Sequence, residues 1–188
     1  MSSIQDLGAP DDPAFASIRR FIVSPDKAGT HQRRLDIPVI DPRPDDVGTL
    51  DGIIRAFYEV ISGPAGAPRQ WARDRTLYVP GARLVSTGVR DEKAYAAVMG
   101  HGEYAEASDG FLAGGFFEHE THRVTRIFGN VTHVWSTYEA RRTPDGPVIA
   151  RGVNSIQLIH DGARWWIVSA AWDNERPDNP ISRNFLPR

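Results

Sequence analysis

From about Phe116 onward, apolar and polar residues of this chain alternate with a period of two through four long segments. Such alternation is typical of β-strands, because successive side chains of a strand point to opposite faces of its sheet. The segments cover residues 116–128, 131–142, 148–160 and 164–174. The first two flank Gly129-Asn130 and the last two flank Asp161-Gly162, which predicts two consecutive hairpins. This part of the chain is therefore expected to form a sequentially connected antiparallel sheet.

The part before these segments has apolar residues at every third or fourth position, which is the period of an α-helix. The first helix is expected at 49–62, from the capping residue Thr49 to Gly63-Pro64. A shorter helix carries Trp71 and is stopped by Pro80-Gly81, and a third helix covers 102–112. Residues 84–87 read as a short strand, and 94–99 as either a strand or a turn of helix. Helices followed by a strand meander, without βαβ alternation, predict an α+β domain whose helices cover one face of the sheet.

The ends of the chain differ in composition from this central part. Residues 1–45 are rich in Pro, Asp, Arg and Gly, apart from a short helix expected at 13–22. Their apolar residues are too many for a fully solvated linker, so we expect the extension to dock in part on the domain. The predicted organisation is an extension at 1–45, one domain at 46–176 and a tail at 177–188.

Charge and composition restrict the partners and the chemistry. The 188 residues carry a formal charge of −2, which gives no reason to expect nucleic acid or an anionic membrane as a partner. Neither a membrane-spanning apolar run nor a signal peptide is present in the sequence, so the expected location is the cytoplasm. Cysteine is absent, which excludes disulfides, thiolate catalysis and Cys-ligated metal sites. No cofactor is expected.

Two adjacent indoles give information on both faces of the sheet. Trp165 and Trp166 point to opposite faces if they lie in one strand, so both faces should be covered. One predicted face is too apolar to be left in water, and a homodimer packed through it is the expected cover, with the N-terminal extension as the alternative. The residues of this predicted dimer face are Ile156, Leu158, Trp166, Val168 and Trp172.

Several local stretches resemble a known superfamily. They are Arg55-Ala56-Phe57-Tyr58, the run 77–84 (LYVPGARL), the run 126–131 (RIFGNV), Ser136-Thr137-Tyr138-Glu139, the run 154–158 (NSIQL), and Asp161-Gly162 followed by Trp165-Trp166-Ile167. Over about 46–175 the chain resembles the nuclear transport factor 2-like (NTF2-like) superfamily, in particular its SnoaL-like, ketosteroid-isomerase-type branch. The resemblance implies an α+β fold, a cone-shaped roll of about three N-terminal helices on a curved antiparallel sheet. It also implies a pocket between helices and sheet, no dissociable cofactor and frequent dimers.

The last hairpin suggests which side chains face such a pocket. With Asp161-Gly162 at its tip, one face carries the candidates Ser155, Gln157, Ser169 and Asp173 together with Trp165 and Ile167. A buried Asp173 could serve as a general base, because desolvation raises the pKa of a carboxyl group. The alternative is a solvated carboxylate or a partner of Arg176.

The first long strand offers a second acid and base. Glu120 and His122 are two residues apart and would share a face, where a carboxylate can orient an imidazole for proton transfer. The alternative is a solvated polar face with cross-strand Glu-Arg pairs. A metal site at His119-Glu120-Thr121-His122 is not expected, because His residues three apart on a strand point to opposite faces.

The remaining candidates lie on the second long strand and the helices. Tyr138 could donate a hydrogen bond to a developing oxyanion, and His133 beside Trp135 is the rival for proton transfer. Tyr58, at the flank of its helix's apolar stripe, and Trp71 are the helical residues expected to line the pocket.

The sequence therefore predicts a pocket for a small hydrophobic molecule. The leading hypothesis is a cofactor-independent lyase, isomerase or cyclase in which Glu120, His122, Tyr138 and Asp173 perform acid/base chemistry. The alternatives are a non-catalytic carrier or sensor and a protein-interaction module. Strand register decides whether Glu120, His122 and Tyr138 or instead His119, His133 and Trp135 face the ligand.

Overall fold

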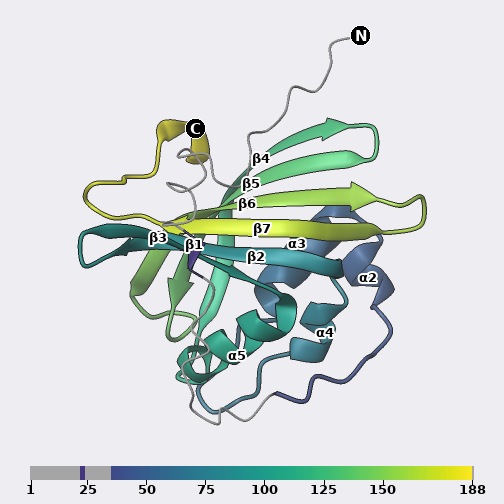
Figure 1. Cartoon of the computed structure of the whole chain (residues 1–188), viewed down its shortest axis with the longest axis horizontal. Coiled ribbons are helices and arrows are strands. Elements are labelled where there is room, and N and C mark those ends of the chain that lie inside the picture. The colour runs from purple at the N-terminus through teal and green to yellow at the C-terminus, as the bar shows by residue number, and fades with distance from the viewer. Residues whose placement is uncertain (1–21, 24–34, 188) are drawn as a thin grey trace, which may run out of the picture.

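The computed structural model describes residues 22–23 and 35–187, and within them the strands form one seven-stranded sheet in the order β1-β3-β2-β7-β6-β5-β4 (Figure 1). The strands are β1 (Ile22–Val23), β2 (Tyr78–Arg90), β3 (Lys93–Met99), β4 (Phe117–Phe128), β5 (Val131–Arg141), β6 (Val148–His160) and β7 (Trp165–Asn174). The helices are α2 (Pro44–Val47), α3 (Leu50–Glu59), α4 (Trp71–Arg75), α5 (His101–Leu112) and the 3₁₀ helix η1 (Arg183–Phe185). No helix of these described segments is long and apolar enough to span a membrane.

The architecture is α+β, as predicted, with α2 to α5 on one side of the sheet (Figure 1). Strands β4 to β7 pair with their sequence neighbours in antiparallel fashion, as expected from their alternation. The sheet as a whole is mixed, because β2 pairs with β7 in parallel and β1 pairs with β3 in parallel. The expectation of a purely antiparallel sheet is therefore wrong.

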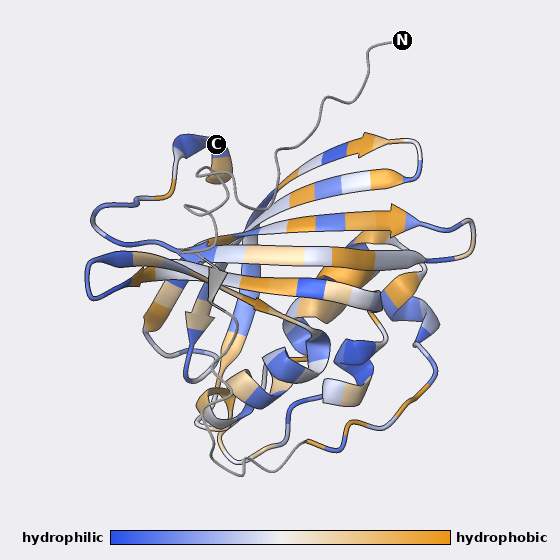
Figure 2. Cartoon of the chain, in the orientation of Figure 1, coloured by the Kyte–Doolittle hydropathy of each residue, from blue (hydrophilic) through white to orange (hydrophobic). Residues whose placement is uncertain are grey.

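Helix α3 forms where the sequence predicts it. The Thr49 hydroxyl accepts a hydrogen bond from the Gly52 backbone N–H at 2.9 Å, which caps the first turn. The apolar stripe of α3 is buried against the sheet, including Ile53, Ile54 and Phe57. Figure 2 shows α3 as mostly apolar and shows apolar and polar bands alternating along the strands. The hydrophobic core therefore lies between α3 and the face of the sheet turned toward it.

The region after α4 differs from its prediction. Helix α4 ends at Arg75, and β2 begins at Tyr78 and continues through Pro80-Gly81. An irregularity in the β2–β7 pairing between Tyr78 and Arg83 accommodates the proline and the glycine, whose φ is 82°. The open question at 94–99 is also answered, because this segment pairs with β2 as strand β3.

Both ends of the chain contact the domain within the described residues. Strand β1 extends the sheet beside β3, and Leu35 and Ile37 pack against the core. The helix expected at 13–22 lies outside the described residues, apart from Ile22. At the other end, the Thr137 hydroxyl donates a hydrogen bond to the Phe185 carbonyl, and the Trp135 and Phe185 rings lie 5.1 Å apart. The C-terminal segment therefore covers part of the sheet on the side away from the helices.

One glycine in the middle of the sheet is required by its neighbours. Gly152 pairs with Tyr138 on one side and with Asn174 on the other, and an added Cβ would collide with the Tyr138 hydroxyl and the Asp173 carbonyl. We expect Gly152→Ala to lower the free energy of unfolding by about 1–3 kcal/mol, measured by urea denaturation, because overpacking forces side chain and backbone to move.

The matched control for this prediction is Gly110→Ala in α5, where an added Cβ has no neighbour within 4 Å. Because alanine is a better helix former than glycine, this variant should be as stable as the wild type or slightly more stable. Equal stability of the two variants would contradict the packing argument.

Candidate functional site

The pairing of β5, β6 and β7 defines two faces of the sheet. Ser136, Asn154 and Trp172 are cross-strand partners and so share one face. The Asn154 amide nitrogen donates a hydrogen bond to the Tyr58 hydroxyl on α3 at 3.1 Å. This face, which we call the inner face, therefore looks toward the helices, and the opposite one is the outer face.

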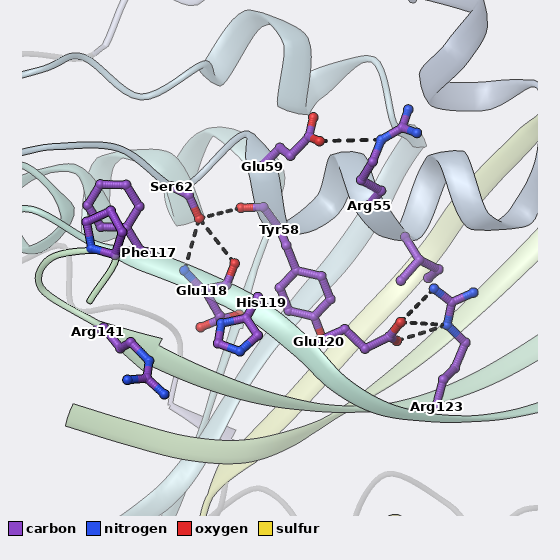
Figure 3. A pocket seen from close by; sticks show the side chains of 12 residues that line it. Arg55, Tyr58, Glu59, Ser62, Phe117, Glu118, His119, Glu120, Arg123 and Arg141 are labelled. Carbon is purple, nitrogen blue, oxygen red and sulfur yellow. Dashed lines mark hydrogen bonds and ion pairs between the residues drawn. The ribbon is translucent and has the colours of Figure 1, made fainter. Parts of the chain in front are cut away.

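Two cavities meet at the first residues of β4. The first, the α3–β4 cavity, has a volume of about 480 Å³ and lies between α3 and β4, the edge strand of the sheet (Figure 3). The second, the inner cavity, has a volume of about 320 Å³ and lies between α3, α5 and the inner face. Glu118 lines both cavities, together with Tyr58, Glu120 and Arg123 in the first and Phe57, Phe111, Tyr138, Asn154 and Trp172 in the second.

Glu118 differs from the other acidic residues of the site because its carboxylate has no hydrogen bond or ion pair with any residue of the described ranges. Its main chain is held instead: the Glu118 N–H donates to the Ser62 hydroxyl at 3.0 Å, and dashed lines in Figure 3 mark both main-chain contacts with Ser62. Burial raises the pKa of Glu118 to about 8, since a desolvated carboxylate without a cation is disfavoured. The group is therefore largely protonated at neutral pH and can exchange a proton with a bound molecule.

Glu118 lies two residues before Glu120 and so shares its side of the strand, but it is not among the candidates that the sequence suggested. The sequence offered one indication. The residues two positions before and after Glu118, which share its side of the strand, are Phe116 and Glu120, and neither of them is basic. Its burial, which shifts the pKa, depends on α3 and α5 and could not be read from the strand alone.

A chain of hydrogen bonds crosses the inner face beside Glu118. The Tyr58 and Ser136 hydroxyls lie 2.6 Å apart, and the Ser136 hydroxyl donates to a Glu120 carboxylate oxygen at 2.5 Å. Because the Ser136 proton is used for Glu120, the Tyr58 hydroxyl is the donor to Ser136. Burial, together with the nearby Glu118, raises the pKa of Tyr58. Tyr58 therefore stays a neutral phenol, and it lines the α3–β4 cavity.

Glu120 is held by a cation and does not have a free carboxylate. The Arg123 guanidinium donates to both Glu120 oxygens at 2.6–2.9 Å and also pairs with Asp51 of α3 at 2.5 Å. The pair lies within one strand, three residues apart, and not across two strands as the polar-face alternative supposed. Glu120 is thus a structural anchor of β4 to α3.

His122 lies on the face opposite to Glu120, so the prediction that they share a face is wrong. Glu120 pairs with Tyr138, but His122 pairs with Thr137, which leaves Thr121 as an extra residue in β4. This β-bulge shifts the alternation by one position, and every β4 residue from His122 onward changes face relative to the expectation. His122 is therefore an outer-face residue, and the proposed Glu120–His122 couple does not form.

Tyr138 lies on the inner face, lines the inner cavity and donates a hydrogen bond from its hydroxyl to the Asn174 side-chain oxygen at 2.7 Å. Burial is the main cause that raises the pKa of Tyr138, followed by the charge of Glu118. The phenol therefore remains protonated, and its single proton goes to Asn174.

Most of the other predicted ligand-binding residues lie on the outer face. There the His133 ring nitrogen Nε2 lies 2.9 Å from the Ser155 hydroxyl, and the Gln157 amide donates to the Thr132 carbonyl at 3.1 Å. Ser169 pairs with Gln157, which places it beside them. Asp173 forms an ion pair with Arg176 at 2.7 Å, as the alternative for this residue supposed.

The prediction of which residues of the last hairpin share a face is wrong, because the pairing of β6 and β7 is irregular. Leu158 pairs with Ile167 while the preceding Gln157 pairs with Ser169, so Val168 is an extra residue in β7. Trp165 and Ile167 therefore face the helices, whereas Ser169 and Asp173 face outward, although all four were predicted to share a face. Trp135, Ser155 and Asp173 line a separate cavity of about 480 Å³ between the outer face and the C-terminal segment.

The predicted dimer face is wrong, because several of its residues are packed against the helices. Ile156 and Leu158 are fully buried in the core on the inner face, and Trp172 packs edge-on against Tyr104 of α5 with ring centres 5.8 Å apart. The homodimer itself stays a prediction. Trp71 is also a core residue: its indole N–H donates to Asp109 at 2.7 Å, and it lines neither cavity at Glu118.

No group of three or more acidic, histidine or cysteine side chains that could hold a metal ion occurs in the described part of the chain.

Neither a protein-family model nor a curated protein matches the sequence. Several solved structures are similar to the chain. One is a protein of unknown function from Mycobacterium tuberculosis, with 12% identity and a TM-score of 0.47 over 72% of this chain and 80% of that one. Another, from Streptomyces avermitilis, is named as a candidate dehydratase from the NTF2-like family, with 17% identity and a TM-score of 0.48 over 68% and 99% of the two chains.

A third structure, from Shewanella frigidimarina, is named as a candidate ketosteroid isomerase, with 14% identity and a TM-score of 0.44 over 65% of this chain and 93% of that one. At these identities the similarity concerns the arrangement of helices and strands and not the residues of a site. Proteins named as NTF2-like, the superfamily that the sequence resembles, are thus among the solved structures to which this chain is similar.

Proposed function

We propose that this protein binds a small, largely apolar molecule beside Glu118 and catalyses a proton transfer on it, as a lyase, isomerase or cyclase without a dissociable cofactor. The observation that carries the proposal is the Glu118 carboxyl, which has no partner among the described residues, faces two cavities and has a pKa of about 8. A general acid or base is most effective when its pKa lies close to the working pH.

The surroundings of Glu118 supply the other requirements of such a reaction. Tyr138 is a buried neutral phenol whose single proton goes to the Asn174 side-chain oxygen, and a substrate oxygen that replaces this acceptor would receive the hydrogen bond while negative charge develops on it. The inner cavity has aromatic walls from Phe57, Phe111 and Trp172, which fit a flat apolar substrate. Proton removal next to a carbonyl group, with Glu118 as base and a tyrosine as donor to the carbonyl oxygen, is the reaction that this arrangement favours.

The alternative is a carrier or sensor that binds the same kind of molecule without reaction. It is favoured by the closed network of Tyr58, Ser136, Asn154 and Glu120, in which the polar groups hold one another. Glu118 stands outside that network, and this difference makes catalysis the better proposal.

The proposal is tested with 2-tetralone, an apolar ketone with exchangeable protons next to its carbonyl. The wild-type protein in D₂O is expected to accelerate deuterium exchange over buffer, followed by proton NMR, with a rate that rises with pH as Glu118 loses its proton near pH 8. Glu118→Gln should lower the protein-catalysed rate by about 100-fold or more, since it removes the group that accepts the proton.

The control for this test is Glu106→Gln on α5, which removes a carboxylate that lines neither cavity at Glu118. This variant should exchange the ketone at the wild-type rate. Ligand binding that shifts signals of the inner cavity, with equal exchange in wild type and Glu118→Gln, would contradict catalysis and favour the carrier.

A further inference from the structure

A separate cavity lies away from Glu118, where residues 35–42 pass over α4 and the beginnings of β2 and α5. This cavity, which we call the arginine cavity, has a volume of about 780 Å³ and shares no lining residue with the two cavities at Glu118. Three arginines line it: Arg75 from α4, Arg83 from β2 and Arg164 from the turn before β7. None of the three forms an ion pair with a carboxylate of residues 35–187.

Arg164 is held in place although it lacks such a partner. Its Nε donates to the Trp165 carbonyl at 3.2 Å, and its Nη2 donates to the Thr76 carbonyl. The guanidinium carbon lies 3.6 Å from the centre of the Trp166 ring. Desolvation lowers the pKa of Arg164, which shows that its charge is partly removed from water. The charge of Asp161 opposes this effect in part, and an anion bound directly to Arg164 would offset the remaining desolvation.

The other two arginines are exposed, and within residues 35–187 they form hydrogen bonds only with main-chain carbonyls. Arg83 donates to Gly81 and Ala82, and Arg75 donates to Ile37 at 3.3 Å. One carboxylate, Asp36, also lines the cavity, without an ion pair to these arginines among the described residues. His101 lies at the edge with its Nε2 bound to Asp74 at 2.9 Å. Among the lining residues three arginines therefore stand against one carboxylate, and Asp161, outside the lining, acts on Arg164 and accepts a hydrogen bond from the Trp166 indole N–H at 2.6 Å.

The rest of the wall is apolar and partly exposed. Val39 is 82% exposed and Ile40 is 43% exposed, and both line the cavity together with Ile37 and Trp166. Exposed aliphatic side chains next to unpaired arginines provide both parts of a site for a molecule with a charged head and an apolar chain.

We propose that the arginine cavity binds an amphipathic carboxylate, with its carboxylate at Arg164 and Arg83 and its aliphatic chain along Ile37, Val39 and Trp166. The planar guanidinium matches a carboxylate with two parallel hydrogen bonds, and Arg164 is already oriented for them by its main-chain contacts and by Trp166. The site is distinct from the proposed proton-transfer site, so each can exist without the other.

The test is a titration of the full chain with sodium octanoate, followed by the indole N–H signal of Trp166 in ¹H–¹⁵N NMR spectra. Octanoate should shift this signal, and the neutral analogue octanamide should bind about tenfold more weakly, because it lacks the charge that pairs with the arginines. Arg164→Gln and Arg83→Gln should each weaken octanoate binding by about tenfold. Binding in Glu118→Gln should equal that of the wild type.

Arg90→Gln is the matched control, because it removes one arginine charge at the end of β2 outside the cavity. Its affinity for octanoate should stay within about twofold of the wild type. If Arg164→Gln does not fold, the affinity of Arg83→Gln for octanoate decides the question, since the exposed Arg83 side chain forms hydrogen bonds only with Gly81 and Ala82 among the described residues. Equal binding of octanoate and octanamide, an unshifted Trp166 signal, or an equal loss in Arg90→Gln would each overturn the proposal.

Discussion

The variant Glu118→Gln is expected to exceed the wild-type protein in free energy of unfolding by about 4–5 kcal/mol at pH 9 and by about 1 kcal/mol or less at pH 5. The cause is the carboxyl group, whose pKa rises from 4.5 to about 8 when the chain folds. Between these values the folded protein binds a proton that the unfolded chain releases. Wild-type stability therefore falls as pH rises through this window, whereas glutamine carries no charge at any pH.

The measurement is urea denaturation of both proteins at pH values from 5 to 9. Glu106→Gln, which removes an acidic residue away from both cavities at Glu118, is the control, and its stability should follow that of the wild type at each pH. A difference between wild type and Glu118→Gln that does not change with pH would contradict the raised pKa. It would also remove the main support for Glu118 as an acid or base.

The second large effect on the free energy of unfolding is expected when the ion pair between α2 and α4 is broken. Arg73 donates to both Asp46 oxygens at 2.6–2.7 Å and to Glu59 at 2.7 Å, and Asp46 is only 1% exposed. Hydrogen bonds from Arg73 are the main cause that lowers the pKa of Asp46. We expect Arg73→Met to lower the free energy of unfolding by about 3–5 kcal/mol at pH 7, because a buried carboxylate is left without a cation.

The double variant Arg73→Met/Asp46→Asn should recover part of this loss, because the uncompensated charge is removed. Arg55→Met is the matched control: its ion pair with Glu59 is solvent-exposed, and its loss should cost less than about 1 kcal/mol. Chemical denaturation of all four proteins measures these differences. A loss in Arg73→Met as small as that in Arg55→Met would contradict the account of a buried ion pair.

The sequence predicted the strands of the last two hairpins to within one or two residues. Strand β6 has the predicted bounds, and the turns at Gly129 and Gly162 have the positive φ values of 55° and 101° that glycine tolerates. These elements depend on local signals: alternation within one segment and a turn residue at its end. Helix α3, with its cap at Thr49, is predictable for the same reason.

Of strand β2, the sequence predicted only residues 84–87, and its first half could not be predicted in the same way. It pairs in parallel with β7, about 90 positions later in the chain, where Tyr78 lies opposite Ile167. The local sequence around Pro80-Gly81 is typical of a helix end or a turn, and only the distant partner makes it part of a strand. The turn between β2 and β3 was also missed, since Asp91 and Glu92 adopt positive φ values without a glycine.

The sequence by itself determined the α+β class, the order of the elements and the presence of acidic and phenolic side chains on the strands, because these follow from period and turn residues. Only the tertiary structure decided which of those side chains face the helices. Two extra residues, Thr121 in β4 and Val168 in β7, shift the alternation by one position and move His122, Ser169 and Asp173 to the outer face. The packing of α3 and α5 then leaves Glu118 only partly exposed, without a cation paired to its carboxylate among the described residues, and this environment is a property of the assembled fold.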